Sequence, residues 1–346
     1  MRTRSTTVAA ALAVCLLMTG GVTLADAGGT ASDHDRGTGR GAFTFAVIGD
    51  IPYGQAQTDA FPGRVDQLNS DPQVQLVDHL GDIKSGSSVC SDDYFAAIRT
   101  QFDRFADPLV YTPGDNEWTD CHRTNNGGYN PLERLDKVRT TFFPSPGRTL
   151  GGHPMRVSSQ VDQGYSENVS YGRGGVAFAA VHIVGSNNSL APWTGNNTST
   201  PEQTAEVLGR TASDIELIRG TFAHARSTRA RAVVLLTQAD MFDPTVTDPQ
   251  YSDYFFGFQP IVRAIAEESA RFSGPVYLFN GDSHVFNQDH PLAVGSRWLA
   301  FYGVKAPAAN LTRITVEGST EVKEWLKVTV DQRVPAVLTI QRIPFS

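Results

Sequence analysis

The stretch that decides the fold is Leu109-Val-Tyr-Thr-Pro-Gly-Asp-Asn-Glu-Trp118. Its first three residues are apolar and favour a short buried strand, and Pro113-Gly114 ends that strand and turns the chain. Asp115, Asn116 and Glu117 therefore follow directly on the carboxyl end of a strand. In open α/β sheets ligands bind at this edge, because helices cover both faces of the sheet.

The same kind of strand exit recurs along the chain. Apolar runs of strand length end in Gly-Asp at Asp50, Asp82 and Asp282, and a run without the glycine ends at Asp240. Parallel strands end at one edge of a sheet, so these acids are expected to lie close together. Carboxylates at such distances repel each other unless a cation lies between them. The pattern predicts a metal site, and the alternative is a set of ordinary turn acids that cap helices and loops.

Spacing and turn signals predict the main secondary structure elements. Apolar residues at helical spacing predict a helix over residues 92–106 with Ser91 as N-cap, and Asn130 with a following proline predicts the start of a second helix. A hairpin is predicted over residues 165–186, and a long helix from Pro201. From residue 297 onward the alternating pattern predicts antiparallel strands.

The first 27 residues have the pattern of a secretory signal peptide. Arg2 and Arg4 precede an apolar run, and Ala25-Asp-Ala27 offers a small-x-small cleavage site. Residues 28–42 are polar and lack periodic apolar positions, which predicts a disordered leader. One domain is expected over residues 43–346, because no linker interrupts the pattern. We therefore expect a secreted or periplasmic, extracytoplasmic protein that has no membrane segment after cleavage.

Charge and cysteine content narrow the partners and the covalent structure. The formal net charge is −7, so the surface is not expected to attract nucleic acid or an anionic membrane. No feature of the sequence indicates an oligomeric state. Cys90 and Cys121 are the two cysteines that remain after cleavage, and an even number in an exported chain predicts a disulfide. The alternative is two free buried thiols.

Taken in order, these motifs resemble those of calcineurin-like metallophosphoesterases. The resemblance covers roughly residues 43–286 and rests on Gly49-Asp50, Gly81-Asp82, Gly114-Asp-Asn-Glu117, Gln238 at a strand end, and Gly281-Asp-Ser-His284. It implies an α/β fold, a four-layer α/β/β/α sandwich with mixed sheets, with two divalent ions at the strand ends. It also implies hydrolysis of a small-molecule phosphomonoester or phosphodiester by a metal-bound hydroxide.

The resemblance assigns ligand positions unevenly. Asp82 stands at the position that bridges the two ions, and it is the strongest single match, whereas four histidine positions of the family pattern hold Pro52, Asn116, Gln238 and Asp282. The implied ligand set is Asp50, Asp82, Asp115, Asn116, Gln238, Asp282 and His284. Because most of these donors are oxygen atoms, Mn²⁺, Mg²⁺ or Ca²⁺ is expected rather than Zn²⁺.

The catalytic roles follow the same resemblance. Asn116 stands where the family has its catalytic histidine, and an amide is a poor proton donor. His122 is the nearest residue to take over that role, although a loop histidine is more often merely solvated. Lys84 is expected to offset the acids, to hold substrate, or to replace the charge of one ion. Arg123 is expected to bind a phosphate oxygen, an exposed surface arginine being the alternative. The changed histidines leave a second hypothesis open, namely a non-catalytic relative that binds a ligand at the same rim.

Overall fold

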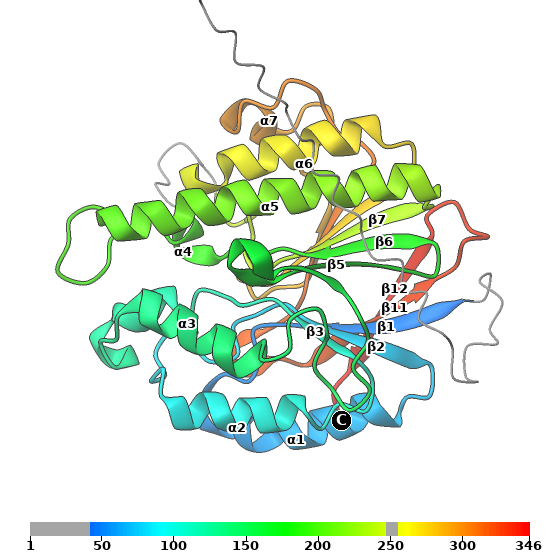
Figure 1. The fold of residues 1–346 in the computed structure, drawn as a ribbon. Helices are drawn as coiled ribbons and strands as arrows, with labels where there is room; N and C mark the ends of the chain where they lie inside the picture. Colours follow the sequence, from blue (N-terminus) through cyan, green and yellow to red (C-terminus); the bar gives the residue numbers. More distant parts are fainter. Residues whose placement is uncertain (1–41, 247–254) are drawn as a thin grey trace, which may run out of the picture.

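The computed structural model describes residues 42–246 and 255–346. The predicted signal peptide and nearly all of the predicted leader lie outside the described residues. In the described part, two β-sheets pack face to face and helices cover their outer faces (Figure 1). No helix there is long and apolar enough to cross a membrane.

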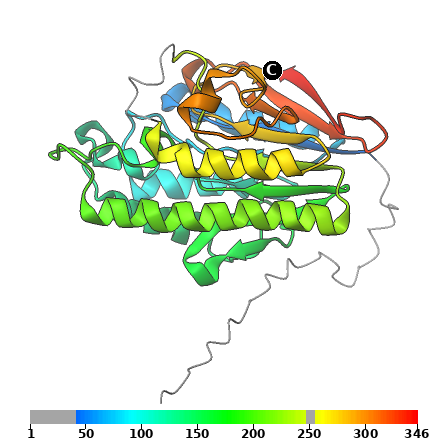
Figure 2. The same cartoon turned by 90° about the horizontal axis from the view of Figure 1, so that it is seen from above.

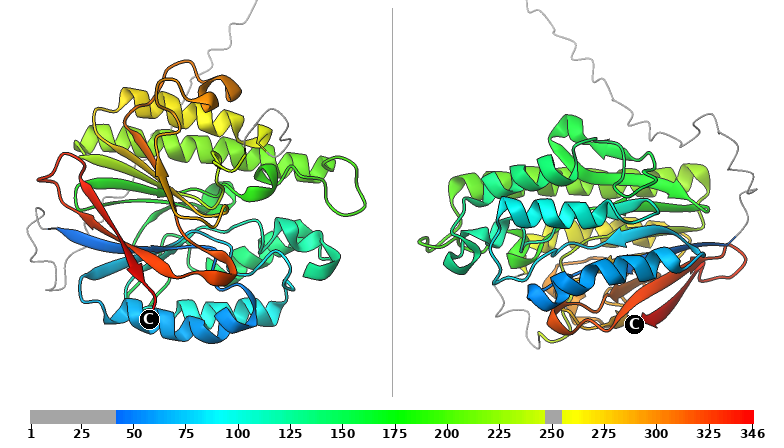
Figure 3. Two further views of the ribbon diagram at one scale, coloured as in Figure 1. Left: turned by 180° about the vertical axis from the view of Figure 1, so that it is seen from behind. Right: turned by 90° about the horizontal axis from the view of Figure 1, so that it is seen from below.

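The first sheet carries the strand exits at Asp50, Asp82 and Asp115. Its strand order among the described residues is β12-β11-β1-β2-β3. β1, β2 and β3 run parallel to one another, and the β11–β12 hairpin joins β1 in antiparallel register (Figure 3). The strand bounds are β1 Phe43–Ile48, β2 Val74–His79, β3 Leu109–Tyr111, β11 Glu324–Val330 and β12 Leu338–Pro344.

The second sheet carries Gln238, Asp240 and Asp282 just beyond its strands. Its strand order in the described residues is β4-β5-β6-β7-β8-β10-β9, with β6, β7, β8 and β10 parallel and the outer strands antiparallel. The bounds are β4 Ser158–Gln160, β5 Tyr165–Arg173, β6 Val176–Ala180, β7 Ala232–Leu236, β8 Val276–Asn280, β9 Asn287–Asp289 and β10 Leu311–Thr315. Both sheets are therefore mixed.

Helices form the two outer layers. α1, α2 and α3 pack on the first sheet, whereas α5 and α6 lie side by side over the second (Figure 2). The short α7 packs beside α6. The helix bounds are α1 Gly54–Ser70, α2 Asp92–Phe102, α3 Pro131–Phe142, α4 Gly185–Asn188, α5 Pro201–Thr228, α6 Gln259–Arg271 and α7 Arg297–Phe301.

Three apolar clusters hold these layers together. One lies between the two sheets and contains aromatic residues such as Phe45, Phe178 and Phe279, whose rings pack edge to face. The other two lie between each sheet and its helices. The four-layer α/β/β/α sandwich with mixed sheets is thus confirmed by the packing of the described residues.

The local signals are confirmed in most places. Ser91 Oγ accepts a hydrogen bond from the Tyr94 N–H at the start of α2, and Asn130 Oδ1 accepts from the Leu132 N–H at the start of α3. The prediction beyond residue 297 is partly wrong. β11 and β12 are antiparallel, but α7 precedes them and β10 runs parallel to β8. A buried parallel strand and a short helix both show apolar runs that local alternation does not distinguish.

Candidate metal centre

The strand exits converge at one end of the sandwich. Asp50, Asp82 and Asp282 each adopt a positive φ, of 53°, 53° and 71°, so the chain turns sharply as each strand ends. The neighbouring glycines allow close approach of these turns. A Cβ atom on Gly281 would lie 2.0 Å from Asp50 Oδ2, and one on Gly114 would lie 2.1 Å from Asp82 Oδ1. The Gly-Asp pattern therefore reflects the crowding of backbone against carboxylate.

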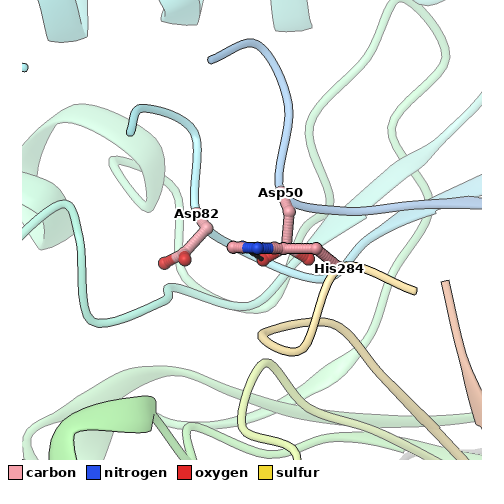
Figure 4. Close-up of side chains that lie close together, drawn as sticks. All are labelled: Asp50, Asp82 and His284. Atoms are coloured by element: carbon pink, nitrogen blue, oxygen red, sulfur yellow. Dashed lines mark ion pairs between the residues drawn. The ribbon is translucent and has the colours of Figure 1, made fainter. Parts of the chain in front are cut away.

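Two groups of side chains have ligand atoms within 4.8 Å of one another. The first contains Asp50, Asp82 and His284, and the second contains Asp82, Asp115 and Asp282. Figure 4 shows the first group, in which His284 Nε2 lies 3.3 Å from Asp50 Oδ1. Asp82 belongs to both groups, which is the arrangement expected of a carboxylate that bridges two ions. These residues come from both sheets.

The electrostatics of the acids favour a cation. Burial raises the pKa of Asp82 well above its ordinary value, and Asp115 and Glu117 raise it further. Burial raises the pKa of Asp282 in the same way, with Asp115 and Asp50 adding to the effect. Burial also raises the pKa of Asp50, although His284 opposes the shift. Buried carboxylates that crowd together in this way are stabilised in their charged form by a bound cation.

The amide side chains depart from the predicted ligand roles. Gln238 Oε1 accepts a hydrogen bond from the Gly185 N–H at 2.7 Å, which directs Gln238 Nε2 toward Asp115 Oδ1 at 3.5 Å. Asn116 Nδ2 donates to Asp82 Oδ2 at 2.6 Å. Hard metal ions bind an amide side chain through its oxygen atom and not through its nitrogen atom. In this arrangement both side chains face the acids as hydrogen-bond donors, and the ligand roles expected of Asn116 and Gln238 remain predictions.

Lys84 is buried beneath the centre rather than exposed to a substrate. It is 0% exposed, and its Nζ donates to the carbonyl oxygens of Asn116 at 2.6 Å and Ser85 at 2.9 Å. Burial lowers the pKa of Lys84 to about 8, while Glu117 and Asp82 raise it. Of the roles predicted for Lys84, the geometry matches compensation of negative charge and not a clamp on substrate.

Glu117 connects two of the strand exits. Its Oε1 accepts hydrogen bonds from the backbone N–H groups of Asp82 at 3.1 Å and Gly114 at 2.6 Å, and from the Tyr111 hydroxyl at 2.8 Å. Burial is the main reason that the pKa of Glu117 is raised. This buried acid therefore sets the relative positions of the Asp82 and Asp115 turns.

His122 and Arg123 lie outside the two ligand groups, in the wall of a pocket of about 540 Å³. The Thr194 N–H donates to His122 Nδ1 at 2.9 Å, so the neutral ring carries its proton on Nε2. Burial and the adjacent Arg123 lower the pKa of His122 to about 4. Arg123 pairs with Asp120 at 2.7 Å and remains 42% exposed. Arg123 is thus accessible from the pocket, whereas His122 is neutral at neutral pH.

Ser186 separates this pocket from a smaller one. The smaller pocket, of about 270 Å³, is lined by Asp282, Asp240 and Phe258 among others, and Ser186 and Asn187 contribute to both walls. Ser186 Oγ lies 2.8 Å from Asp115 Oδ2 and 2.9 Å from Asp120 Oδ1. Residues 186–189 all have positive φ, an uncommon conformation for four consecutive residues other than glycine. The second ligand group is therefore adjacent to both pockets.

Several residues of the centre were missed by sequence reasoning. The Tyr53 hydroxyl donates to Asp82 Oδ2 at 2.7 Å, and Ser186 contacts Asp115. Asp240 pairs with the buried Arg313 at 2.5 Å and accepts a hydrogen bond from Ser283 Oγ. Tyr53 could have been recognised from the sequence, because it follows closely after Asp50 in the chain. Ser186 and Arg313 carried no local signal, because tertiary packing alone brings them to the acids.

The predicted disulfide between Cys90 and Cys121 is confirmed, with their Cα atoms 5.9 Å apart. Both cysteines are fully buried. Their sulfur atoms lie 3.5 and 3.7 Å from the carbonyl oxygen of Asn116, which also accepts the hydrogen bond from Lys84. The disulfide therefore packs directly beneath the turn that carries Asp115 and Asn116.

Comparison with known proteins yields distant structural likenesses. No protein-family model matches the chain, and no curated protein sequence matches it. One similar solved structure is GAP50, the anchor in the inner membrane complex of Plasmodium, with 8% identity, coverage of 88% of this chain and 89% of that chain, and a TM-score of 0.44. Another is NAD nucleotidase (NadN) of Haemophilus influenzae, with 13% identity, coverage of 88% and 50%, and a TM-score of 0.41. This chain thus spans half the length of NadN.

The class of the protein is defined by its own layers and motifs. The chain has the α/β/β/α fold that the resemblance to calcineurin-like metallophosphoesterases implied. The donor set of the two ligand groups, four carboxylates and one imidazole, fits hard divalent ions. The glycine-lined turns and the crowded buried acids are consistent with the same fit.

Proposed function

We propose that the chain is an exported, metal-dependent phosphoesterase that hydrolyses a small-molecule phosphomonoester or phosphodiester. The observation that carries the proposal is the position of Asp82, which is shared by two groups of potential ligands. A second supporting feature is the pair of pockets that flank Ser186 beside these groups. The predicted signal peptide and the buried disulfide support export.

Asp50, Asp82, His284, Asp115 and Asp282 would hold the ions in this proposal. Bound divalent ions would neutralise phosphate charge and lower the pKa of water. Lys84 and Arg313 offset the negative charge of the acids. Lys84 donates to the Asn116 carbonyl oxygen, and Arg313 pairs with Asp240. Arg123, on the wall of the larger pocket, has the exposure and the planar donors needed to bind a phosphate oxygen.

The organic part of the substrate would occupy the larger pocket. That pocket of about 540 Å³ has the size of a small-molecule site. Its wall combines apolar residues, Leu190 and Pro192, with polar ones such as Asn197 and Ser199. The smaller pocket presents several acids, so an anionic organic group would be repelled there.

A specific observation favours the alternative of a non-catalytic ligand-binding protein. Asn116 stands at the position of the family's proton donor, and its Nδ2 is engaged by Asp82 and Tyr53. His122, the predicted replacement, is neutral near pH 7 because its pKa is lowered to about 4. An imidazole in its neutral form is a poor general acid. Under this alternative, the same rim binds a ligand without turnover.

The two functions are separated by metal analysis and a substrate screen. Purified mature protein is assayed for bound metal, and then for hydrolysis of phosphomonoesters and phosphodiesters with Mn²⁺, Mg²⁺, Ca²⁺ and Zn²⁺. We expect bound metal and turnover that is lost in Asp82→Asn. Asp78→Asn is the matched control, because Asp78 is a buried acid in β2, the strand that leads to Asp82, and lies outside both groups. Metal binding without turnover for any ester would instead support the ligand-binding alternative.

A further inference from the structure

Tyr53 is placed inside the metal centre by the turn that follows β1. It directly precedes α1, and only 5% of its surface is exposed. Its hydroxyl donates a hydrogen bond to Asp82 Oδ2 at 2.7 Å and accepts one from Asn116 Nδ2 at 2.7 Å. His284 Nε2 lies 3.4 Å from the same oxygen. The phenol oxygen therefore contacts two of the three members of the first ligand group.

These contacts differ from those of Tyr94, which is partly buried, and of Tyr302, which is buried. The Tyr94 hydroxyl donates to the carbonyl oxygen of Ile83, and the Tyr302 hydroxyl to that of Met241. Backbone carbonyls are common partners for polar side-chain atoms in a protein interior. The Tyr53 hydroxyl instead contacts side chains of the acidic centre, and its ring packs edge to face on the ring of His284. Tyr111 and Tyr171 also donate to buried acids, Glu117 and Asp78, but those acids belong to neither ligand group.

An ion held by the first ligand group would have coordination positions left for another oxygen ligand. Asp50, Asp82 and His284 offer three ligand atoms, whereas hard ions such as Mg²⁺ take about six. Asn116 faces the group with its amide nitrogen and supplies no oxygen there. The second group is flanked instead by Ser186 and Gln238. The phenol oxygen of Tyr53 already lies between Asp82 and His284.

We propose that the phenol oxygen of Tyr53 is a further ligand for the ion held by Asp50, Asp82 and His284. When the bond between this oxygen and the ion forms, the phenol proton passes to solvent and its hydrogen bond to Asp82 is lost. Asn116 Nδ2 remains a donor to the oxygen. The ion is a hard one such as Mn²⁺, because a phenol oxygen joins carboxylates and one imidazole. The proposal rests on the metal site of the proposed function and not on catalysis.

The test compares Tyr53→Phe with Tyr94→Phe, which removes a partly buried hydroxyl that contacts backbone oxygens of the same turns. Calorimetric titration with Mn²⁺ is expected to show two binding events in the wild type. Tyr53→Phe should weaken one event by about 10-fold or more and leave the other, whereas Tyr94→Phe should leave both. The ultraviolet difference spectrum on Mn²⁺ addition should contain a tyrosinate band in the wild type and in Tyr94→Phe only.

Diffraction distinguishes a ligand from a residue that only positions Asp82. In Mn²⁺-loaded crystals, anomalous scattering should place an ion roughly 2.0 to 2.6 Å from the phenol oxygen. An ion too distant to coordinate that oxygen, with no tyrosinate band, would overturn the proposal even if Tyr53→Phe weakens binding. That result would leave the proposed phosphoesterase function intact. Wild-type protein that binds no divalent ion would overturn both.

Discussion

The two ligand groups share Asp82 but balance their charge differently. In the first, the imidazole of His284 lies 3.3 Å from Asp50, and the Tyr53 hydroxyl donates to Asp82. Burial lowers the pKa of His284, but Asp50 and Asp115 together raise it by more, so the net shift is upward and favours the protonated ring. The first group therefore has a cation of its own when the ring is protonated.

The second group consists of carboxylates alone. Asp82, Asp115 and Asp282 repel one another, and Ser186 and Gln238 offer them only neutral hydrogen-bond donors. Of the two groups, this one depends more on a bound ion, because no cationic side chain is among its members. The comparison indicates that metal binding and metal-free stability are set by different residues.

The largest expected effect comes from Asp82→Asn, because Asp82 is the one member that both groups share. We expect loss of both Mn²⁺ binding events in calorimetry. Each ion loses a charged ligand, and no carboxylate is then common to the two groups. Asp78→Asn, in the strand that leads to Asp82, should retain both events. Retention of one strong event in Asp82→Asn would show that the two groups are independent and that Asp82 does not bridge them.

A smaller effect, confined to one group, is expected from Asp282→Ala. This change should remove one Mn²⁺ event and leave the metal-free protein no less stable, because it deletes a buried carboxylate that faces Asp115 and Asp50. His284→Ala should remove the other event without any gain in metal-free stability, because it leaves Asp50 without its nearby imidazole. Thermal melts with EDTA and with Mn²⁺ provide the measurement. Full Mn²⁺ stabilisation of Asp282→Ala would exclude Asp282 as a ligand.

The smallest effect concerns the pH dependence of the metal-free protein. A buried acid whose pKa is raised keeps a proton that the unfolded chain releases, so its contribution to the free energy of unfolding falls as pH rises above about 4. Asp82 and Asp282 both have raised pKa values. Each pKa unit corresponds to about 1.4 kcal/mol. We expect the melting temperature in EDTA to fall from pH 5 to pH 8 more steeply in wild type than in Asp282→Ala.

Saturating Mn²⁺ should reverse this pH dependence. The ligand carboxylates bind the ion in their charged form, so metal affinity and the stabilisation that it provides increase with pH. The slope difference between wild type and Asp282→Ala in EDTA is the diagnostic quantity, because other titrating groups are common to both proteins. Equal slopes would mean that Asp282 does not keep its proton in the metal-free state.

The local sequence was sufficient to predict the class of fold and the position of most of the acids at the strand ends. Strands that end in Gly-Asp lie in parallel order in each sheet, and parallel strands expose their carboxyl ends at one edge. Side-chain caps at Ser91 and Asn130 start the helices where their residue types predict. The disulfide followed from two cysteines in an exported chain. These features depend on residue type or on the geometry of neighbouring residues, and both can be inferred from the sequence alone.

The roles of individual side chains were decided by tertiary structure. Lys84 is predicted equally well as a clamp or as a counter-charge until its burial and its bond to the Asn116 carbonyl are known. Gln238 turns its amide nitrogen toward Asp115 because the distant Gly185 N–H occupies its oxygen. Ser186 reaches Asp115 only once the two sheets have packed together, and Tyr53 reaches Asp82 through the pairing of β1 with β2. A hydrogen-bond donor is oriented by all its neighbours at once, and those neighbours come from segments that are far apart in the sequence.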